Sequence, residues 1–137
     1  FSQKPIQCTL SLAYGSYDIY DKKPNTSSGP VFIESGRGLE KAQRGELLLN
    51  FEQKYHRDDI KLLNQFLNHL LNKLTKTQAE LLYQYIESDF SEHKKLADLT
   101  GTTRQNISNR LANIGAFLVR DYITVINKQV ILLKENS

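Results

Sequence analysis

The sequence predicts an α+β protein, in which a small partial sheet with one helix precedes an all-α region. Three observations lead to this fold class. Residues 5–20 alternate apolar and polar side chains, as a half-buried strand does. From residue 57 onward, apolar residues recur at spacings of three and four, as on one face of a helix. Further on, short helical patterns are separated by turn-forming residues. We therefore expect a partial α/β segment at 1–56, a linker helix at 57–74 and a helical domain at 75–137.

The first strand is expected within "PIQCTLSLAYGSYDIY", residues 5–20. The face that we expect to be buried consists of Ile6, Cys8, Leu10 and Leu12. A second strand is expected to continue from Tyr17 to Ile19 after a bend. Cys8 is the only cysteine, so no internal disulfide can form. We expect it to be a small buried hydrophobe in a reducing, cytoplasmic compartment.

Residues 21–30 are turn formers almost throughout and predict a loop. A helix is expected over 30–43, because proline is tolerated in a first helical turn. Its buried side chains are expected to be Phe32, Ile33 and Leu39. Gly36 and Gly38 disfavour this helix, but glycines there permit close packing against a sheet. The apolar run "ELLLNFE", 46–52, predicts the next strand.

The most regular helical pattern covers residues 57–74. Its apolar stripe consists of Ile60, Leu63, Leu67, Leu70 and Leu74, and it is widened by Leu62, Phe66 and Leu71. Asp58 and Asp59 fall in the first turn, where the helix dipole favours anions. The spacing also fits a coiled-coil seam, but it covers barely two heptads, so we favour packing within the chain.

Three short helices are expected to follow, each with its own boundary signal. Thr77 and Glu80 predict a capping box, and the apolar face of that helix is expected to contain Ala79, Leu82, Tyr83 and Ile86. A second helix is expected over 92–99, with Leu96, Ala97 and Leu99 apolar. Gly101 stands where a left-handed turn is needed, and a third helix is expected from Thr103.

Helix, glycine turn and helix is the arrangement of a helix-turn-helix, which places its second helix in the DNA major groove. Ala97 must be small because the two helices cross there. Ile107 and Leu111 are expected to anchor the last helix, which leaves its amide-rich side facing outward. The residues that we expect to contact DNA are Thr102, Thr103, Arg104, Gln105, Asn106, Ser108, Asn109, Arg110, Lys94 and Lys95.

These residue types suit a duplex. Gln and Asn can pair with adenine and Arg with guanine, while hydroxyls and lysines hold phosphates. Residues 99–120 contain no Asp or Glu, a local bias that the net charge of +3 conceals. The alternative interpretation is a trihelical spacer or protein-binding surface, because polar amides on an exposed helix are ordinary.

The final segment, "AFLVRDYITVINKQVILLKE", repeats its polar positions helically and predicts one long helix. Six of the nine residues 123–131 are β-branched, and Asn127 with Lys128 could form the turn of a winged-helix hairpin. We favour the helix. No apolar run approaches the roughly 20 residues needed to cross a bilayer, so no membrane association is expected. The chain begins with Phe1 and contains no methionine, so we expect it to be a fragment of a longer protein.

With these pieces placed, the chain resembles the SatD family. The resemblance rests on "PIQCTLSLAYGSYDIY", on "SGPVFIESGRGLEKAQ" through Gly29, Pro30, Phe32 and Leu39, and on "TQAELLYQYI" with "LADLTGTTRQNISNRL". It implies a partial ferredoxin-like sheet of the palm type found in nucleotide cyclases, followed by a helix-turn-helix. The chain departs from the family at Gly36, where a basic residue is common, and it lacks the family's N-terminal acidic motifs.

No catalytic constellation is expected in this chain. The carboxylate pairs Asp18/Asp21 and Asp58/Asp59 have no phosphate-cradling glycine loop attached, and no Cys/His spacing suggests zinc. We therefore expect no metal and no cofactor, and a bacterial-type transcription regulator that binds double-stranded DNA as a homodimer. The sequence does not identify a nucleotide or small-molecule effector. The rival hypotheses are a nucleotide-binding, cyclase-like palm fragment and a protein-interaction adaptor without catalysis.

Overall fold

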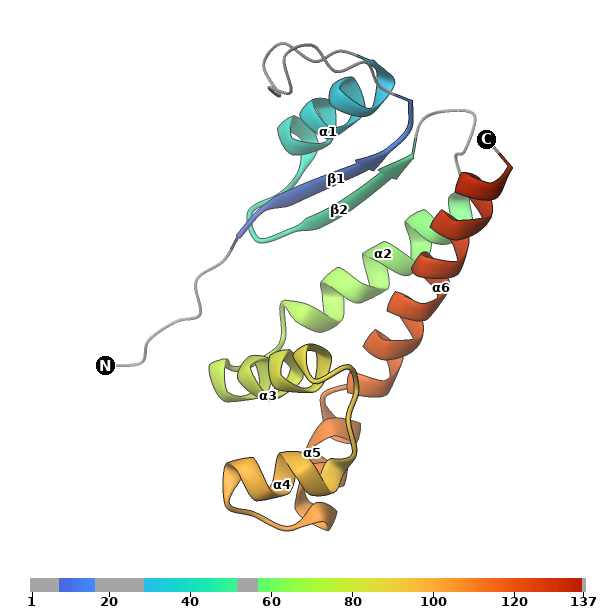
Figure 1. Ribbon diagram of the computed structural model, residues 1–137. Coiled ribbons are helices and arrows are strands. Elements are labelled where there is room, and N and C mark those ends of the chain that lie inside the picture. Colours follow the sequence, from blue (N-terminus) through green and yellow to red (C-terminus); the bar gives the residue numbers. More distant parts are fainter. Residues whose placement is uncertain (1–7, 17–28, 52–56, 137) are drawn as a thin grey trace, which may run out of the picture. The chain divides into compact units, whose positions relative to one another are not determined.

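The computed structural model describes residues 8–16, 29–51 and 57–136. Within these residues, two strands and six helices confirm the predicted α+β class (Figure 1). The chain divides into two compact units. The sheet unit comprises the described residues between 8 and 68 together with 129–136, and the helical unit comprises 69–128. None of the described helices combines the length and apolar composition that a bilayer-spanning segment needs.

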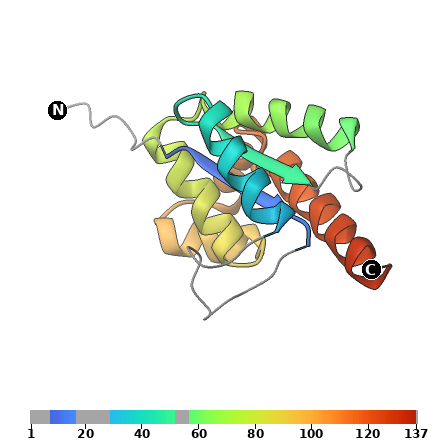
Figure 2. The ribbon, with the colours of Figure 1, turned by 90° about the horizontal axis from the view of Figure 1, so that it is seen from above.

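The sheet unit is built on a parallel pair of strands. β1 (Leu10–Tyr14) pairs with β2 (Leu47–Phe51), with Leu10 opposite Leu47 and Tyr14 opposite Phe51. Parallel strands need a crossover connection, and α1 (Pro30–Lys41) lies within it. Seen from above, α1 covers one face of the two strands (Figure 2). The helix predicted at 30–43 and the strand predicted at 46–52 are both confirmed.

The face of β1 that α1 covers is not the one expected from the sequence. Leu10 and Leu12 are 53% and 54% exposed, and Cys8 is exposed as well. Ser11 instead faces α1 at Gly38, where an added Cβ would lie 2.3 Å from the Ser11 hydroxyl oxygen. The burial prediction is wrong because alternation separates two faces of a strand without saying which one the helix covers. Ile6, the second strand expected at 17–19 and the loop expected at 21–28 lie outside the described residues.

Gly38 also sets the orientation of α1. It is the buried residue of that helix, and its missing side chain lets the helix approach the sheet, as the sequence suggested. Phe32 is half-buried, whereas Ile33 and Leu39 are exposed, so their predicted burial is wrong. The physical reason is that the glycine-centred side faces the strands and turns these two apolar side chains away from them.

α2 (Asp58–Leu71) confirms the long helix predicted at 57–74, with Asp58 and Asp59 in its first turn. Its buried face in the sheet unit consists of Ile60, Asn64, Leu67 and Asn68, whereas Leu62, Leu63 and Phe66 are exposed. The two asparagines replace expected leucines because this face of α2 meets the backbone of Leu47, which offers a free donor and acceptor. Asn68 Oδ1 accepts from the Leu47 N–H at 2.8 Å, and Asn64 Nδ2 donates to the Leu47 carbonyl at 2.8 Å.

The start of α2 is held by a charged pair. Arg57 Nε donates to Asp59 Oδ1 at 3.1 Å, and Arg57 also donates to Gln129 Oε1 at the beginning of the last stretch of the sheet unit. The hydrogen bond from Arg57 holds the pKa of the Asp59 carboxyl below its usual range. Both side chains are exposed, so this pair fixes local geometry more than it stabilises the fold.

The helical unit contains α3 (Lys76–Glu87), α4 (His93–Thr100) and α5 (Arg104–Asn113), followed by the first part of α6 (Ala116–Glu135). Because α6 is one continuous helix, the prediction of a long final helix is confirmed and the alternative hairpin is wrong. The buried apolar residues of this unit are Leu81, Leu82, Tyr85, Leu96, Ala97, Ile107, Leu111, Ile114, Ala116 and Val119.

The boundary of α3 differs from the prediction. Thr75, not Thr77, is the N-cap, and it forms a capping box with Gln78 rather than Glu80. The buried face also differs from the predicted one, because Leu81 and Tyr85 are buried together with the predicted Leu82, whereas Tyr83 is exposed. Sequence spacing allows both boxes, and the structure contains the one formed by Thr75 and Gln78.

Candidate nucleic-acid interface

The turn between α4 and α5 depends on Gly101. Its backbone is left-handed, with φ 68° and ψ 30°, as the sequence predicted. A Cβ built there would meet no atom within 4 Å, so the requirement for glycine is conformational rather than steric. The N–H groups of Gly101 and Thr102 both donate to the carbonyl of Ala97. These two hydrogen bonds terminate α4, with Gly101 as its C-cap.

α5 begins immediately after this turn. Thr103 is its N-cap, and the Thr103 hydroxyl oxygen accepts from the Asn106 N–H at 3.1 Å. The Thr103 hydroxyl oxygen therefore caps α5, and the hydroxyl proton can still be donated to another group. Thr102, another residue expected at the interface, is half-buried in the turn.

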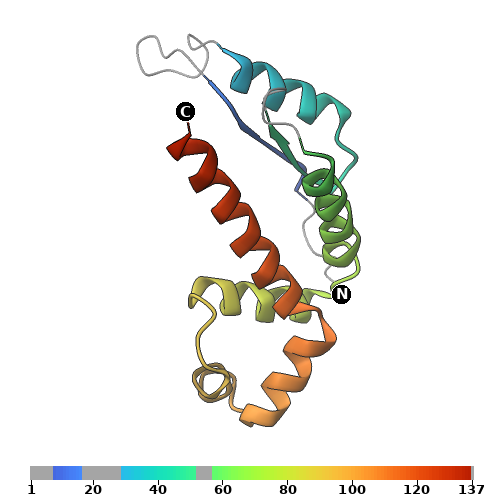
Figure 3. The same ribbon diagram turned by 90° about the vertical axis from the view of Figure 1, so that its right-hand side faces the viewer.

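Apolar contacts fix α5 against α4. Ile107 and Leu111 are both 0% exposed, and Leu96 and Ala97 of α4 are almost as fully buried. Figure 3 shows α4 close to end-on with α5 running across the view beside it, so the two helices cross steeply. The small side chain of Ala97 allows this close crossing, and the predicted anchoring by Ile107 and Leu111 is confirmed.

The side of α5 opposite these anchors is polar and exposed. Arg104, Gln105, Asn106 and Asn109 all lie in solvent. Gln105 Nε2 donates to Asn109 Oδ1 at 3.3 Å, so the two amides form one surface group with a free acceptor and free donors. A free amide acceptor and free amide donors are complementary to the N6 donor and the N7 acceptor that adenine presents in the major groove. Ala112 is exposed on the same face, and sequence reasoning did not single it out.

Ser108 does not face outward as expected. It is half-buried, and its hydroxyl lies 2.5 Å from His93 Nδ1 at the start of α4. The His93 ring also stacks on Phe117, with centroids 5.7 Å apart and planes 11° from parallel. Ser108 therefore joins α5 to α4 and is removed from the set of exposed DNA contacts. Nothing in a separation of 15 residues signals this bond, so the sequence could not reveal His93.

His93 belongs to an aromatic cluster in the helical unit. Tyr85 of α3 contacts the rings of Phe90, His93 and Phe117, with centroid distances of 5.3–6.2 Å. Arg120 covers the Phe117 ring at 5.4 Å, and the neighbouring Asp121 raises the pKa of its guanidinium. The cluster connects α3, α4 and α6, so it fixes the first turn of α4 from several sides.

The basic residues expected to hold phosphates fall in two places. Lys94 and Lys95 are exposed in the first turn of α4. Arg110 is half-buried and lines a groove of about 290 Å³ with Thr77, Glu80, Leu81, Gln84 and Thr100, so it faces α3. Arg110 therefore lies on the flank of α5 opposite Ser108, which contacts the start of α4.

No protein-family model, curated protein or solved structure matches this chain. The resemblance to the SatD family therefore stays a prediction. Among the residues that the structure describes, no three or more His, Cys, Asp or Glu side chains gather where they could hold a metal ion.

Proposed function

We propose that the protein is a cytoplasmic, DNA-binding transcription regulator that places α5 in the major groove. One observation supports this proposal above the others. α5 is amphipathic. Ile107 and Leu111 are fully buried on one side, and the opposite side consists of amide and guanidinium groups. Amide and guanidinium groups are the side chains that pair with base edges in the major groove, so this exposed side suits sequence recognition.

The exposed groups suit different parts of a duplex. Gln105 and Asn109 have the geometry to pair with adenine, and Arg104 can pair with guanine at the same edge of the groove. Lys94 and Lys95 at the start of α4 can neutralise phosphates, and so can the positive dipole end of α5. Asn106 can contact either strand from the first turn of α5. Ser108 does not contact the duplex, and its hydrogen bond with His93 holds α5 in place against α4.

A single helix of this length contacts only a few base pairs, so we propose that a homodimer binds two half-sites. The half-sites would lie about 34 Å apart, one turn of the duplex, or a multiple of that distance. A site selected from random duplexes should accordingly be a palindrome. A selected site without two-fold symmetry would argue against the homodimer and leave the assignment of α5 untouched.

A salt titration tests the electrostatic half of the proposal. Binding to a duplex should weaken steeply as salt rises, because each neutralised phosphate releases counterions. Lys95→Ala should lower the slope of log K against log salt by about one. The matched control is Lys73→Ala, which removes an exposed lysine beyond the end of α2 and should leave the slope unchanged.

A double variant tests the recognition half. Arg104→Ala with Gln105→Ala should abolish the preference for the selected duplex while leaving weak, salt-dependent binding to any duplex. Gln43→Ala with Arg44→Ala is the control, because it removes the same two residue types from an exposed segment of the sheet unit. Unchanged preference in the first double variant would show that α5 does not recognise the sequence, and absence of binding to every duplex would refute the whole proposal.

A further inference from the structure

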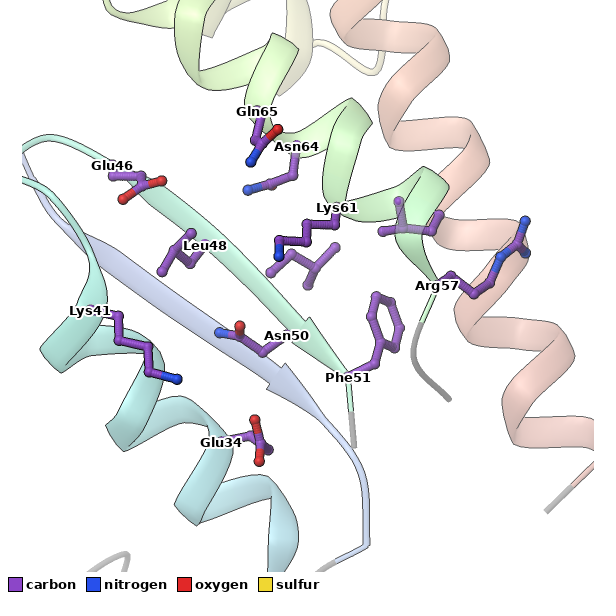
Figure 4. A pocket seen from close by; sticks show the side chains of 12 residues that line it. Glu34, Lys41, Glu46, Leu48, Asn50, Phe51, Arg57, Lys61, Asn64 and Gln65 are labelled. Atoms are coloured by element: carbon purple, nitrogen blue, oxygen red, sulfur yellow. The ribbon is translucent and has the colours of Figure 1, made fainter. Parts of the chain in front are cut away.

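The free edge of β2 lies in a groove of the sheet unit. The groove has a volume of about 370 Å³, and it is lined by residues of α1, β2 and α2 but by none of β1. Figure 4 shows Lys41 and Glu34 extending from α1 on one side of β2, and Lys61 and Asn64 from α2 on the other. The groove therefore follows the side of β2 that has no neighbouring strand among the described residues.

The register of the sheet shows which backbone groups of β2 face this groove. The Leu10 N–H donates to the Glu46 carbonyl, so even-numbered residues of β2 bond to β1 and odd-numbered residues point away. Leu47, Leu49 and Phe51 consequently offer their N–H and C=O groups to the free edge. A strand edge of this kind is a template for another extended chain.

Side chains of α2 already form hydrogen bonds with the backbone groups of Leu47, the first of these residues. Asn68 accepts from the Leu47 N–H, and Asn64 and Asn68 both donate to its carbonyl, at 2.8 Å and 2.6 Å. These two side chains supply the bonds that a neighbouring strand would supply. Within the described residues, Leu49 and Phe51 have no such partner on that side.

Some of the charged side chains around the groove have bonding partners within the chain, and others do not. The Glu46 carboxylate accepts from the Gln43 N–H at 2.8 Å, and Glu34 lies 3.9 Å from Arg37. Arg57, at the far end, is bound to Asp59. In the described part of the chain, Lys41 and Lys61 have no ion-pair partner. The groove therefore presents two lysines without ion-pair partners and one carboxylate, Glu46, so its unpaired side chains carry a net charge of one positive unit beside the unpaired backbone groups.

We propose that this groove binds an extended acidic segment of another protein, which adds a strand to the free edge of β2. Leu49 and Phe51 bond to the backbone of the added strand, and Lys41 and Lys61 pair with its carboxylates. The flanking helices α1 and α2 form the walls, and Asn64 and Asn68 end the site at Leu47. This binding is independent of contact between α5 and DNA, so each proposal can fail without the other.

The test uses the full chain and a labelled, end-blocked hexapeptide, Thr-Glu-Val-Glu-Val-Thr, with a basic peptide that has Lys in place of both Glu. Fluorescence anisotropy should show that the acidic peptide binds more tightly than the basic one. Hydrogen exchange measured by NMR should show new protection of the Leu49 and Phe51 amides. The Leu48 and Asn50 amides already bond to β1 and should change little.

Charge reversal tests the lysines. Lys41→Glu with Lys61→Glu should weaken binding of the acidic peptide by about tenfold or more at low salt and should strengthen binding of the basic peptide. Lys73→Glu with Lys128→Glu makes the same change in net charge on exposed residues of the helical unit and should leave both affinities as they were. If the two double variants have equal effects, the lysines of the groove do not contact the peptide.

Leu49→Pro tests the backbone contact. The Leu49 N–H faces the free edge, where proline is tolerated, so the sheet should persist by circular dichroism while peptide binding is lost. If the variant does not fold, protection of the Leu49 and Phe51 amides in the unmodified protein decides the question. Unchanged binding by a folded Leu49→Pro variant would overturn the proposal. A self-association of the chain that Leu49→Pro abolishes would also overturn it, because the edge would then belong to a second copy.

Discussion

Two glycines of the helical unit allow backbone strain to be separated from steric overlap. Gly101 and Gly115 have almost the same left-handed backbone, with φ values of 68° and 73°. Their surroundings differ, because a Cβ at Gly101 would meet nothing within 4 Å, whereas one at Gly115 would lie 2.6 Å from Leu70 Cδ1. Alanine at each position therefore imposes the same conformational cost and a different packing cost.

The expected magnitudes follow from these environments. Gly101→Ala should lower the free energy of unfolding by about 1–2 kcal/mol, the cost of a left-handed conformation for a residue with a Cβ. Gly115→Ala should cost about 1 kcal/mol more, at the low end for overpacking, since Cδ1 is the end of a side chain that can rotate. Urea denaturation followed by circular dichroism at unchanged m-value measures both differences.

A double-mutant cycle shows whether Leu70 is the cause. In a Leu70→Ala background, Gly115→Ala should cost no more than Gly101→Ala does, because the overlapping methyl is gone. Gly101→Ala should be unaffected by the same background, which makes it the control. Equal costs for the two glycines in the unmodified background, or a cost at Gly115 that survives the removal of Leu70, would refute the steric reasoning.

Three further predictions concern other contacts. Thr75→Ala should lower the free energy of unfolding by about 1 kcal/mol through loss of the capping box, whereas Thr77→Ala should have little effect; equal effects in denaturation would contradict the assigned cap. Asn68→Leu should cost about 1–3 kcal/mol, because it leaves the first N–H of β2 without its acceptor, and amide exchange at that position should accelerate. The hydrogen bond from Tyr83 to Glu87 raises the pKa of the phenol, so this bond stabilises the fold below the unfolded pKa and is lost as pH rises through the folded value. An NMR titration that follows the Tyr83 ring should show its phenol ionising at lower pH in Glu87→Gln, and an unchanged midpoint would rule the bond out.

The sequence predicts well those elements whose boundaries are set by local chemistry. Gly101 and Thr103 mark the turn before α5 because left-handed backbone and an N-cap each select few residue types. Ile107 and Leu111 were identifiable as anchors because a helix repeats its buried side at a fixed spacing. The existence of α1, β2, α2 and α6 follows from the same local reasoning.

Contacts between distant residues could not be predicted. Leu10 and Leu12 are exposed because α1 lies on the other face of β1, and that choice depends on Gly38, which is remote in sequence. Asn64 and Asn68 are buried because a strand edge needs polar partners, a need that no periodicity within α2 expresses. Within the candidate interface, the His93 ring bonds to the Ser108 hydroxyl 15 residues away, a contact that no local sequence pattern encodes.

The crossover in the sheet unit has a kinetic consequence. Leu10 meets Leu47 only after the intervening 36 residues have closed into a loop, whereas α4 and α5 meet across a turn of three residues. Chain closure over a long loop is entropically slower than contact between neighbours, so helices α3 to α5 should acquire native structure before the strands pair. During refolding of the whole chain, α5 would then be in place while the edge of β2 is still being formed.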